Sequence, residues 1–263
     1  MKQHKKQLIA WAILLVVLLI GSLLVSPPDQ PQETIKAAMR DAVLHNENQI
    51  SLFGLKDVNP GLISAFTVTA VILGFALVVR IFLIPRFRYV PGRLQLLLEE
   101  AVGLFDNMAK TNSPKMNGFL GAYIFATGVY VFVGTIFELF GFQVLTTGGR
   151  SIAMPAPLSD VNAAIALGCL SYLVIVSGGI RGNGVKGLGS ALKEFSLPIS
   201  MSFRLFGALL SGLLVTELVY YYMSLSFVLP VVVGVLFTLL HALIQSYVLT
   251  MLTALFYGEV SES

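Results

Sequence analysis

Six long apolar stretches dominate this sequence and restrict what the chain can fold into. They lie at residues 8–25, 61–84, 119–140, 160–180, 198–223 and 230–257. An α-helix of about 20 apolar residues, rising about 1.5 Å per residue, crosses a hydrocarbon layer about 30 Å thick. Hydrophobic residues make up 56% of the chain and charged residues 12%, a balance outside that of soluble globular domains. The sequence therefore predicts an all-α membrane protein with five to six transmembrane helices.

The first stretch leaves two interpretations of the N-terminus open. It follows the basic segment MKQHKKQ and is either a membrane anchor or the apolar core of a signal peptide. A run of this length is long for a signal core, and the following SPPDQP contains no small-x-small cleavage site, which favours an uncleaved anchor over residues 1–25. Residues 26–60 are expected to form a polar loop with an amphipathic helix at 34–45, and residues 61–263 the membrane domain.

The chain around the later stretches also carries structural signals. Residues 92–110 read GRLQLLLEEAVGLFDNMAK, with leucine and phenylalanine at nearly helical spacing and acidic residues opposite. This pattern predicts an interfacial amphipathic helix, and Pro85 and Pro91 should end the helix before it. The last two stretches would span about 39 and 42 Å, more than the hydrocarbon thickness. We expect them to form a long tilted hairpin over residues 198–257.

Lysine and arginine gather on one side of this topology. With six spans, most of them flank the membrane on the side of the N-terminus, which puts both chain ends in the cytoplasm. Five spans, after cleavage of the first, would leave the new N-terminus outside. Loops are expected after the third span, where Gly and Pro are frequent, and at residues 181–195.

Several functional classes find no support in the sequence. The net charge of +3 comes without a basic, aromatic-rich surface for nucleic acid. Cys169 is the only cysteine, which excludes an intramolecular disulfide and a cysteine-based metal cage. The chain has no Gly-rich phosphate loop, zinc-protease motif or nucleophile elbow. We expect a protein that has no catalytic residues, cofactor or metal site of its own.

Arg204 is the residue that most needs an explanation. It lies in LPISMSFRLFGALLSG, with no other charged residue between Glu194 and Glu217. Arginine stays protonated in proteins and costs about 2.5 to 3.5 kcal/mol at mid-membrane on insertion scales, so it needs a partner or water. The positions on its helical face are all small: Ser200, Gly207, Ala208, Ser211 and Gly212. Arg204 is therefore either a charge on an ion pathway or half of a structural salt bridge, facing a close neighbour that carries a carboxylate.

Further polar residues lie within the apolar stretches. Four of them fall along one side of the last expected helix: Thr238, His241, Gln245 and Thr253. His241 is either a proton-transfer group or a hydrogen-bonded packing residue. Glu138 and Glu217 are the acids, and each is either an ion-path residue or a member of a hydrogen-bond network between helices. Glu217 is the better path candidate because it shares the hairpin with Arg204.

Four motifs, in order, resemble subunit a of F-type ATP synthases, the stator half of the ion channel beside the rotating c-ring. They are VPGRLQLLLEEAVGLFDN, PAPLSDVNAAIALG, PISMSFRLFGALLSG and HALIQSYVLTMLTALFY. The resemblance covers residues 61–257, and the last two motifs match the long C-terminal helices of the family. It implies a non-catalytic, multi-pass subunit of a bacterial-type plasma membrane, with membrane lipid, the c-ring and subunit b or the peripheral stalk as partners.

The resemblance also implies roles for individual residues. In the family, two offset aqueous half-channels carry protons, or sodium, to and from the c-ring and couple ion flow to ATP synthesis or hydrolysis. Arg204 matches the family's essential arginine and Gln245 its partner glutamine. Asn162 matches a polar residue of the half-channel that opens to the outer side, with Asp160 beside it. The small face around Arg204 would then meet the c-ring.

The sequence departs from the common family pattern at three positions. Ala208 replaces the asparagine of the usual RLFGN. Leu213 and Thr238 stand where an acid and an imidazole commonly face each other across the hairpin. The familiar acid and histidine pair is therefore missing from its usual place, although the arginine and glutamine are retained.

Two nearby residues offer a replacement for this pair. If Arg204 and Gln245 are level in an antiparallel hairpin, His241 lies opposite Ala208. We hypothesise that His241 replaces the polar group lost there and that Glu217 takes the role of the acid. The two side chains would be about 13 Å apart along the hairpin and would need bridging water.

Two other functions remain open on the sequence alone. The chain could be a stand-alone ion channel or secondary transporter whose membrane-buried arginine binds an anionic substrate. It could also use its polar residues only to hold the helices together. A stator subunit should need its ring to transport ions, whereas a channel should work alone.

Overall fold

A computed structural model describes residues 50–52, 55–145, 151–221 and 234–262, and positions 13, 16, 17, 20 and 232. Four helices in this part are long and apolar enough to cross a membrane: Pro60–Arg86, Asn117–Phe140, Val161–Lys193 and Gly234–Glu262. The predicted all-α membrane architecture is confirmed. The expected anchor at 1–25 as a whole, the helix at 34–45 and the turn after residue 221 lie outside the described residues.

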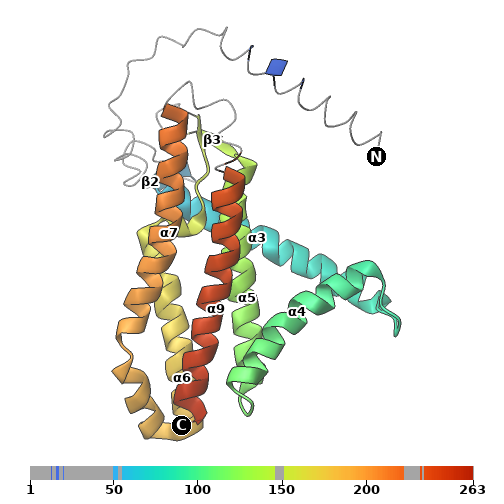
Figure 1. Cartoon of the computed structure of the whole chain (residues 1–263), viewed down its shortest axis with the longest axis vertical. Coiled ribbons are helices and arrows are strands. Elements are labelled where there is room, and N and C mark those ends of the chain that lie inside the picture. Colours follow the sequence, from blue (N-terminus) through green and yellow to red (C-terminus); the bar gives the residue numbers. More distant parts are fainter. Residues whose placement is uncertain are drawn as a thin grey trace.

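The helices α5 (Asn117–Phe137), α6 (Val161–Lys193), α7 (Ser196–Tyr221) and α9 (Leu239–Glu262) form an upright bundle (Figure 1). A π-helical turn at Gly234–Thr238 precedes α9. α9 packs against α5 and α6, and α7 packs mainly against α6. The last two helices run antiparallel as a long pair, as expected, and α6 is a principal neighbour of both.

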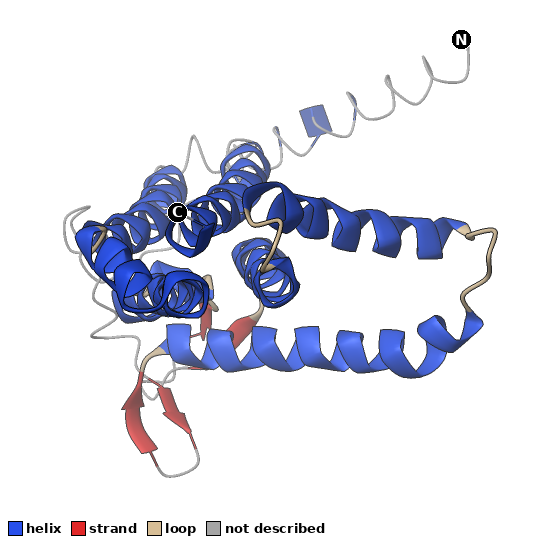
Figure 2. Cartoon of the chain, turned by 90° about the horizontal axis from the view of Figure 1, so that it is seen from below, coloured by secondary structure: helices blue, strands red, loops and turns tan. Residues whose placement is uncertain are grey.

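The α3 and α4 helices form an arm that projects from the bundle (Figures 1 and 2). α3 (Pro60–Val78) continues through a π-helical turn at Val79–Leu83 and a 3₁₀ turn at Ile84–Arg86. The helical path ends there, because Pro85 has no backbone N–H to donate. α4 (Arg93–Asn112) coincides with the predicted amphipathic helix and returns to pack on α5 and α9.

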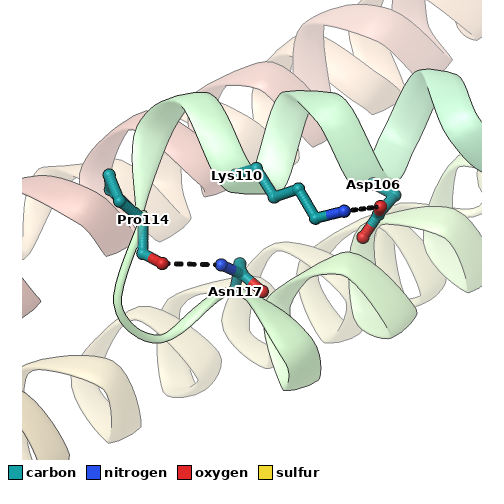
Figure 3. Close-up of polar contacts among 4 residues, drawn as sticks. All are labelled: Asp106, Lys110, Pro114 and Asn117. Carbon is teal, nitrogen blue, oxygen red and sulfur yellow. Dashed lines mark hydrogen bonds and ion pairs between the residues drawn. The ribbon is translucent and has the colours of Figure 1, made fainter.

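Polar contacts order the turn between α4 and α5 (Figure 3). Asp106 and Lys110, one helical turn apart on α4, form an ion pair. The side-chain amide of Asn117 donates to the backbone oxygen of Pro114 at 2.8 Å. The ion pair supports the last turns of α4, and the Asn117 bond closes the turn that leads into α5.

Glycine lets the bundle helices approach each other closely. A Cβ on Gly168 of α6 would collide with Ser202 and lie 2.9 Å from the backbone oxygen of Pro198, both on α7. Gly178, further along α6, lies against the buried ring of Tyr257 on α9. Small residues at such contacts are common in membrane proteins, where helix association depends on close packing because lipid is as apolar as leucine. α6 is thereby held against both α7 and α9.

The segment at 181–195 is helical, so the expectation of a loop there was wrong. α6 continues to Lys193 and reverses direction at Gly184, whose φ of +58° suits glycine. Beyond the reversal the chain runs back along itself, and the backbones of Gly179 and Gly187 meet. The glycines that suggested a loop instead let two helical segments pack without side chains between them.

Two short β-hairpins lie in regions expected to be loops. β1 (Ile50–Leu52) pairs with β2 (Leu55–Val58), and β3 (Gln143–Leu145) pairs with β4 (Ser151–Ala153), both antiparallel. Each hairpin adjoins the end of a membrane helix. Strand pairing satisfies backbone groups where a helix no longer does, so local pairing forms within segments that are polar by composition.

Candidate functional site

α7 presents two different faces. Buried residues recur at every fourth position on the side of α6: Leu197, Met201, Leu205 and Leu209. Arg204 lies on the other side and is exposed, next to Phe203, which is 69% exposed. The same helix therefore turns an apolar stripe inward and the arginine outward.

Arg204 has no partner among the described residues. Its guanidinium forms neither an ion pair nor a hydrogen bond within that part of the chain. Glu217 is 13 positions further along the same helix, about 20 Å away at helical rise. The structural salt bridge and the carboxylate neighbour considered from the sequence are thus not found within the described chain.

Much of the small face around Arg204 is exposed within the described part of the structure. Three of its members are exposed and two are half-buried: Ser200, Gly207 and Ser211, then Ala208 and Gly212. A Cβ added at Gly207 or Gly212 would meet no atom within 4 Å. The face therefore offers a smooth outer surface that a helix from outside this chain could approach closely.

Gln245 of α9 is buried at 5% exposure, and its side-chain oxygen has no hydrogen-bond partner among the described residues. The position of Gln245 along the bundle axis can be compared with that of Arg204 through the contacts of α6. Gly168 meets α7 near Pro198, and Gly178 meets α9 at Tyr257. Counting about 1.5 Å per residue along the helices places Arg204 and Gln245 within about 3 Å in height. They lie at the same level on neighbouring helices, although no hydrogen bond joins them.

His241 lies one turn before Gln245 and is half-buried. Its Nδ1 is 2.7 Å from the backbone oxygen of Phe237, and the two rings stack. A carbonyl oxygen can only accept, so Nδ1 is the donor in this contact. In the neutral ring Nε2 is then an acceptor, able to take a proton from water or a carrier.

Asp160 and Asn59 join the starts of two helices. One Asp160 carboxylate oxygen accepts from the Asn162 backbone N–H at 2.8 Å and caps α6. The other accepts from the Asn59 side-chain amide at 2.7 Å, and the Asn59 oxygen accepts from the Gly61 N–H and caps α3. Asn162 itself is exposed. Sequence reasoning missed Asn59, although an asparagine before Pro-Gly at a helix start is a capping signal.

Five of the predicted polar residues gather at one end of the bundle. They are Glu138, Asp160, Asn162, Thr238 and His241, from the end of α5 and the starts of α6 and α9. The 3₁₀ turn that follows α5, Glu138–Phe140, contacts the π-helical turn before α9. The end of α5 and the start of α9 therefore lie together. Counting along the helices as above puts Asn162 about 3 Å above Arg204. The arginine therefore lies just inside the polar end.

Two other predicted residues stand apart from this group. Thr253 is buried, and its hydroxyl donates to the Leu249 backbone oxygen, so its hydrogen bond stays within α9. Glu217 belongs to the C-terminal end of α7, and its side chain lies outside the described part of the structure. The structure thus supports a shorter polar stripe on α9 than the sequence suggested.

Comparison with protein families identifies the architecture. The model of the family described as ATP synthase A chain matches residues 62–258. The chain belongs to this family. Two proteins named ATP synthase subunit a, from Cereibacter sphaeroides strains ATCC 17025 and ATCC 17029, are each 26% identical to it over 182 residues. Each alignment covers 65% of this chain and 70% of the relative.

Membership of the ATP synthase A chain family sets the broad role of the chain. It is a multi-pass membrane subunit of an ATP synthase, and its family takes part in ATP synthesis and ion transport. The matched range begins in α3 and ends in the last turns of α9, and it includes Arg204, His241 and Gln245. Residues 1–61, with the first apolar stretch and the β1–β2 hairpin, lie outside it.

Proposed function

We propose that this chain is the stator subunit through which protons, or sodium ions, reach and leave the c-ring, coupling ion flow to ATP synthesis or hydrolysis. The observation that carries the proposal is the outward position of Arg204 on a face of small residues. A charge at mid-membrane needs a partner or water, and the described part of the chain supplies no ion-pair partner for Arg204. The partner is then a carboxylate on another subunit that approaches this face.

The physical chemistry of such a contact explains ion transfer. A rotor carboxylate that faces lipid is held neutral, because desolvation disfavours its charged form. Opposite Arg204 the charged form is favoured, so the ion leaves the carboxylate there. The same fixed positive charge opposes direct passage of cations between half-channels, so ions must ride the ring. Each charge that crosses 100 mV carries about 2.3 kcal/mol.

The polar end of the bundle is proposed as the outer half-channel. Asn162 and His241 lie within about one turn of Arg204 in height, and Nε2 of His241 can accept a proton. Glu138 and Asp160 lie closer to the outer end, and Glu217 on α7 would stand in for the acid missing at Leu213. Water between these groups would complete the path.

The proposed partners follow from this role. The c-ring would meet α7, subunit b or the peripheral stalk would hold the chain, and lipid would cover the remaining apolar surface. The subunit would be non-catalytic, because the ATP chemistry belongs to other subunits of the complex. We place it in a bacterial-type plasma membrane.

A stand-alone channel or transporter is the competing function. It is favoured by one observation, since an exposed arginine without a partner in the described chain also suits an anionic substrate. Reconstitution of the chain alone separates the two. Ion flux or anion uptake by the isolated chain in vesicles would support the channel, whereas flux that appears only with the c-ring present supports the stator.

The decisive test of the stator proposal is ATP-driven ion uptake in inverted membrane vesicles carrying Arg204→Ala. Arg181→Ala removes the same charge from α6, where Arg181 stacks over Phe119 at 5.4 Å, and serves as the control. Uptake should be lost only in Arg204→Ala, with the complex assembled and the ATPase activity of the detached headpiece unchanged in both. Normal uptake in Arg204→Ala would show that the charge is not part of coupling.

A further inference from the structure

A second group of arginines lies far from α7, where α3 turns into α4 at the tip of the arm (Figure 1). Arg86, Arg88 and Arg93 line a cavity of about 600 Å³ at this turn. The remaining walls are mostly apolar: Phe82, Leu83, Phe87, Val90 and Leu94. The cavity therefore combines a cluster of positive charge with an apolar surface.

The positive charge of this cavity is not balanced by the chain. All the residues that line it are described, and none is acidic. Within the described chain, none of the three guanidinium groups forms an ion pair. The nearest acid along α4, Glu99, accepts a hydrogen bond from Gln95 at 2.7 Å. Three like charges around one space repel each other, so the cavity favours an anion.

The backbone of the turn is ordered. Gln95 accepts from the Arg88 backbone N–H at 3.0 Å and donates to the Arg88 backbone oxygen at 2.9 Å. Pro85 and Pro91 restrict the backbone on either side of Arg88. The arginines therefore start from a fixed frame, which lowers the entropy lost when a ligand binds.

We propose that this cavity binds the phosphate headgroup of an acidic phospholipid. Guanidinium groups bind phosphate oxygens through two parallel hydrogen bonds, and the phenylalanine and leucine walls suit acyl chains. The topology predicted from the lysine and arginine distribution puts this turn on the inner side, where basic pockets meet acidic lipid. Free phosphate shares the headgroup chemistry but would leave the apolar walls without a partner. The site is independent of the stator proposal, since it shares no residue with the face of α7.

The experiment measures lipid binding to the assembled complex in nanodiscs of phosphatidylcholine, using fluorescent phosphatidylglycerol as the probe and fluorescent phosphatidylcholine as the neutral comparison. The test variant is R86Q/R88Q/R93Q. The matched control is K115Q/K186Q/K193Q, which removes three exposed positive charges elsewhere on the inner side. The test variant loses the paired hydrogen bonds between guanidinium and phosphate, so it should bind phosphatidylglycerol at least about tenfold more weakly than wild type. The control loses only general charge attraction and should weaken binding severalfold less than the test variant.

Two further arms separate the possible ligands. Inorganic phosphate at millimolar concentration should not displace phosphatidylglycerol if the acyl chains contribute. R86K/R88K/R93K keeps the charge and the topology signal, so it covers the case in which the glutamine variant fails to assemble. It should bind phosphatidylglycerol severalfold more weakly than wild type, because lysine cannot form the paired hydrogen bonds.

Three results would overturn the proposal. One is an equal loss of phosphatidylglycerol binding in R86Q/R88Q/R93Q and in K115Q/K186Q/K193Q, which would mean that the lipid is held by general charge attraction. Another is wild-type binding by R86K/R88K/R93K, which would exclude guanidinium recognition. The third is ready displacement of the lipid by inorganic phosphate, which would make the site one for a free anion.

Discussion

Asn59 and Asp160 are hydrogen-bonded at 2.7 Å although 101 positions separate them in the chain, and each also caps its own helix. One short network therefore satisfies backbone donors at two helix starts and ties α3 to α6. Caps of this kind contribute about 1 kcal/mol each. The link matters for the proposed path because Asn162 follows directly on α6.

Replacing Asn59 with Ala should destabilise the chain by about 1 to 3 kcal/mol, since a cap is lost and Asp160 loses a donor. Thermal unfolding of the detergent-solubilised complex measures this. Asn117→Ala, which loses only the local bond to Pro114, should have a smaller effect. Asp160→Ala combined with Asn59→Ala should cost less than the sum of the two single changes. Strict additivity would show that the pair is not coupled.

Gln245→Leu should raise the stability of the chain and reduce transport. The side-chain oxygen of Gln245 is buried without a hydrogen bond to the described chain, and such a group costs about 1 to 3 kcal/mol. A leucine of similar size removes that cost. The neighbouring Ser246 donates to the Gly128 oxygen at 2.8 Å, so Ser246→Ala should lower stability by about 1 kcal/mol. The unfolding temperature should rise in Gln245→Leu and fall in Ser246→Ala. A loss of stability in Gln245→Leu would contradict the prediction.

Gly207→Phe should leave the chain folded and block its proposed contact with the rotor. Gly207 is exposed, and no atom lies within 4 Å of a Cβ added at that position. Gly189→Phe, at an exposed glycine of α6 with equal space around it, is the matched control. ATP-driven uptake should fall at least about tenfold in the first variant only, through overpacking at a close interface. Wild-type uptake in Gly207→Phe would mean that no close partner covers this face.

His241→Ala and Glu217→Gln should each lower the pumping rate about tenfold or more, if both carry protons in place of the missing pair. Leu240→Ala, at an exposed position beside His241, should leave the rate near wild type. Proton uptake by inverted vesicles with equal amounts of assembled complex gives the comparison. Unchanged rates in both His241→Ala and Glu217→Gln would exclude the replacement hypothesis.

Several features of the fold could be read directly from residue patterns. Four of the six apolar stretches, at 61–84, 119–140, 160–180 and 230–257, coincide with helices able to cross a membrane. The spacing of leucine in 92–110 predicted α4 within two residues of its observed bounds. Both signals are local, because helix periodicity and span length depend on neighbouring residues alone. The reversal at Gly184 was not predictable in the same way. Glycine is common in loops and in close helix contacts, and only the packed structure distinguishes the two.

The candidate site also has features that the sequence shows directly and features that depend on the packed structure. The identity of Arg204, the small residues around it and the departures at Ala208, Leu213 and Thr238 are properties of the sequence. The level of Arg204 with Gln245 follows from two glycine contacts of α6, at Gly168 and Gly178, which no local pattern reveals. The role of Asn59 likewise depends on a partner more than a hundred residues away in the chain.

The sequence by itself determined that this chain enters a membrane, which segments are apolar enough to cross it and which unusual charge it must place there, because these properties depend on transfer from water to lipid and on helical periodicity. Only the tertiary structure decided the direction in which that charge points. α7 buries its leucine stripe against α6, and this packing turns Arg204 and its small neighbours to the outside. The direction is set by which face finds the better packing partner within the chain, a property of the assembled helices that no single helix contains.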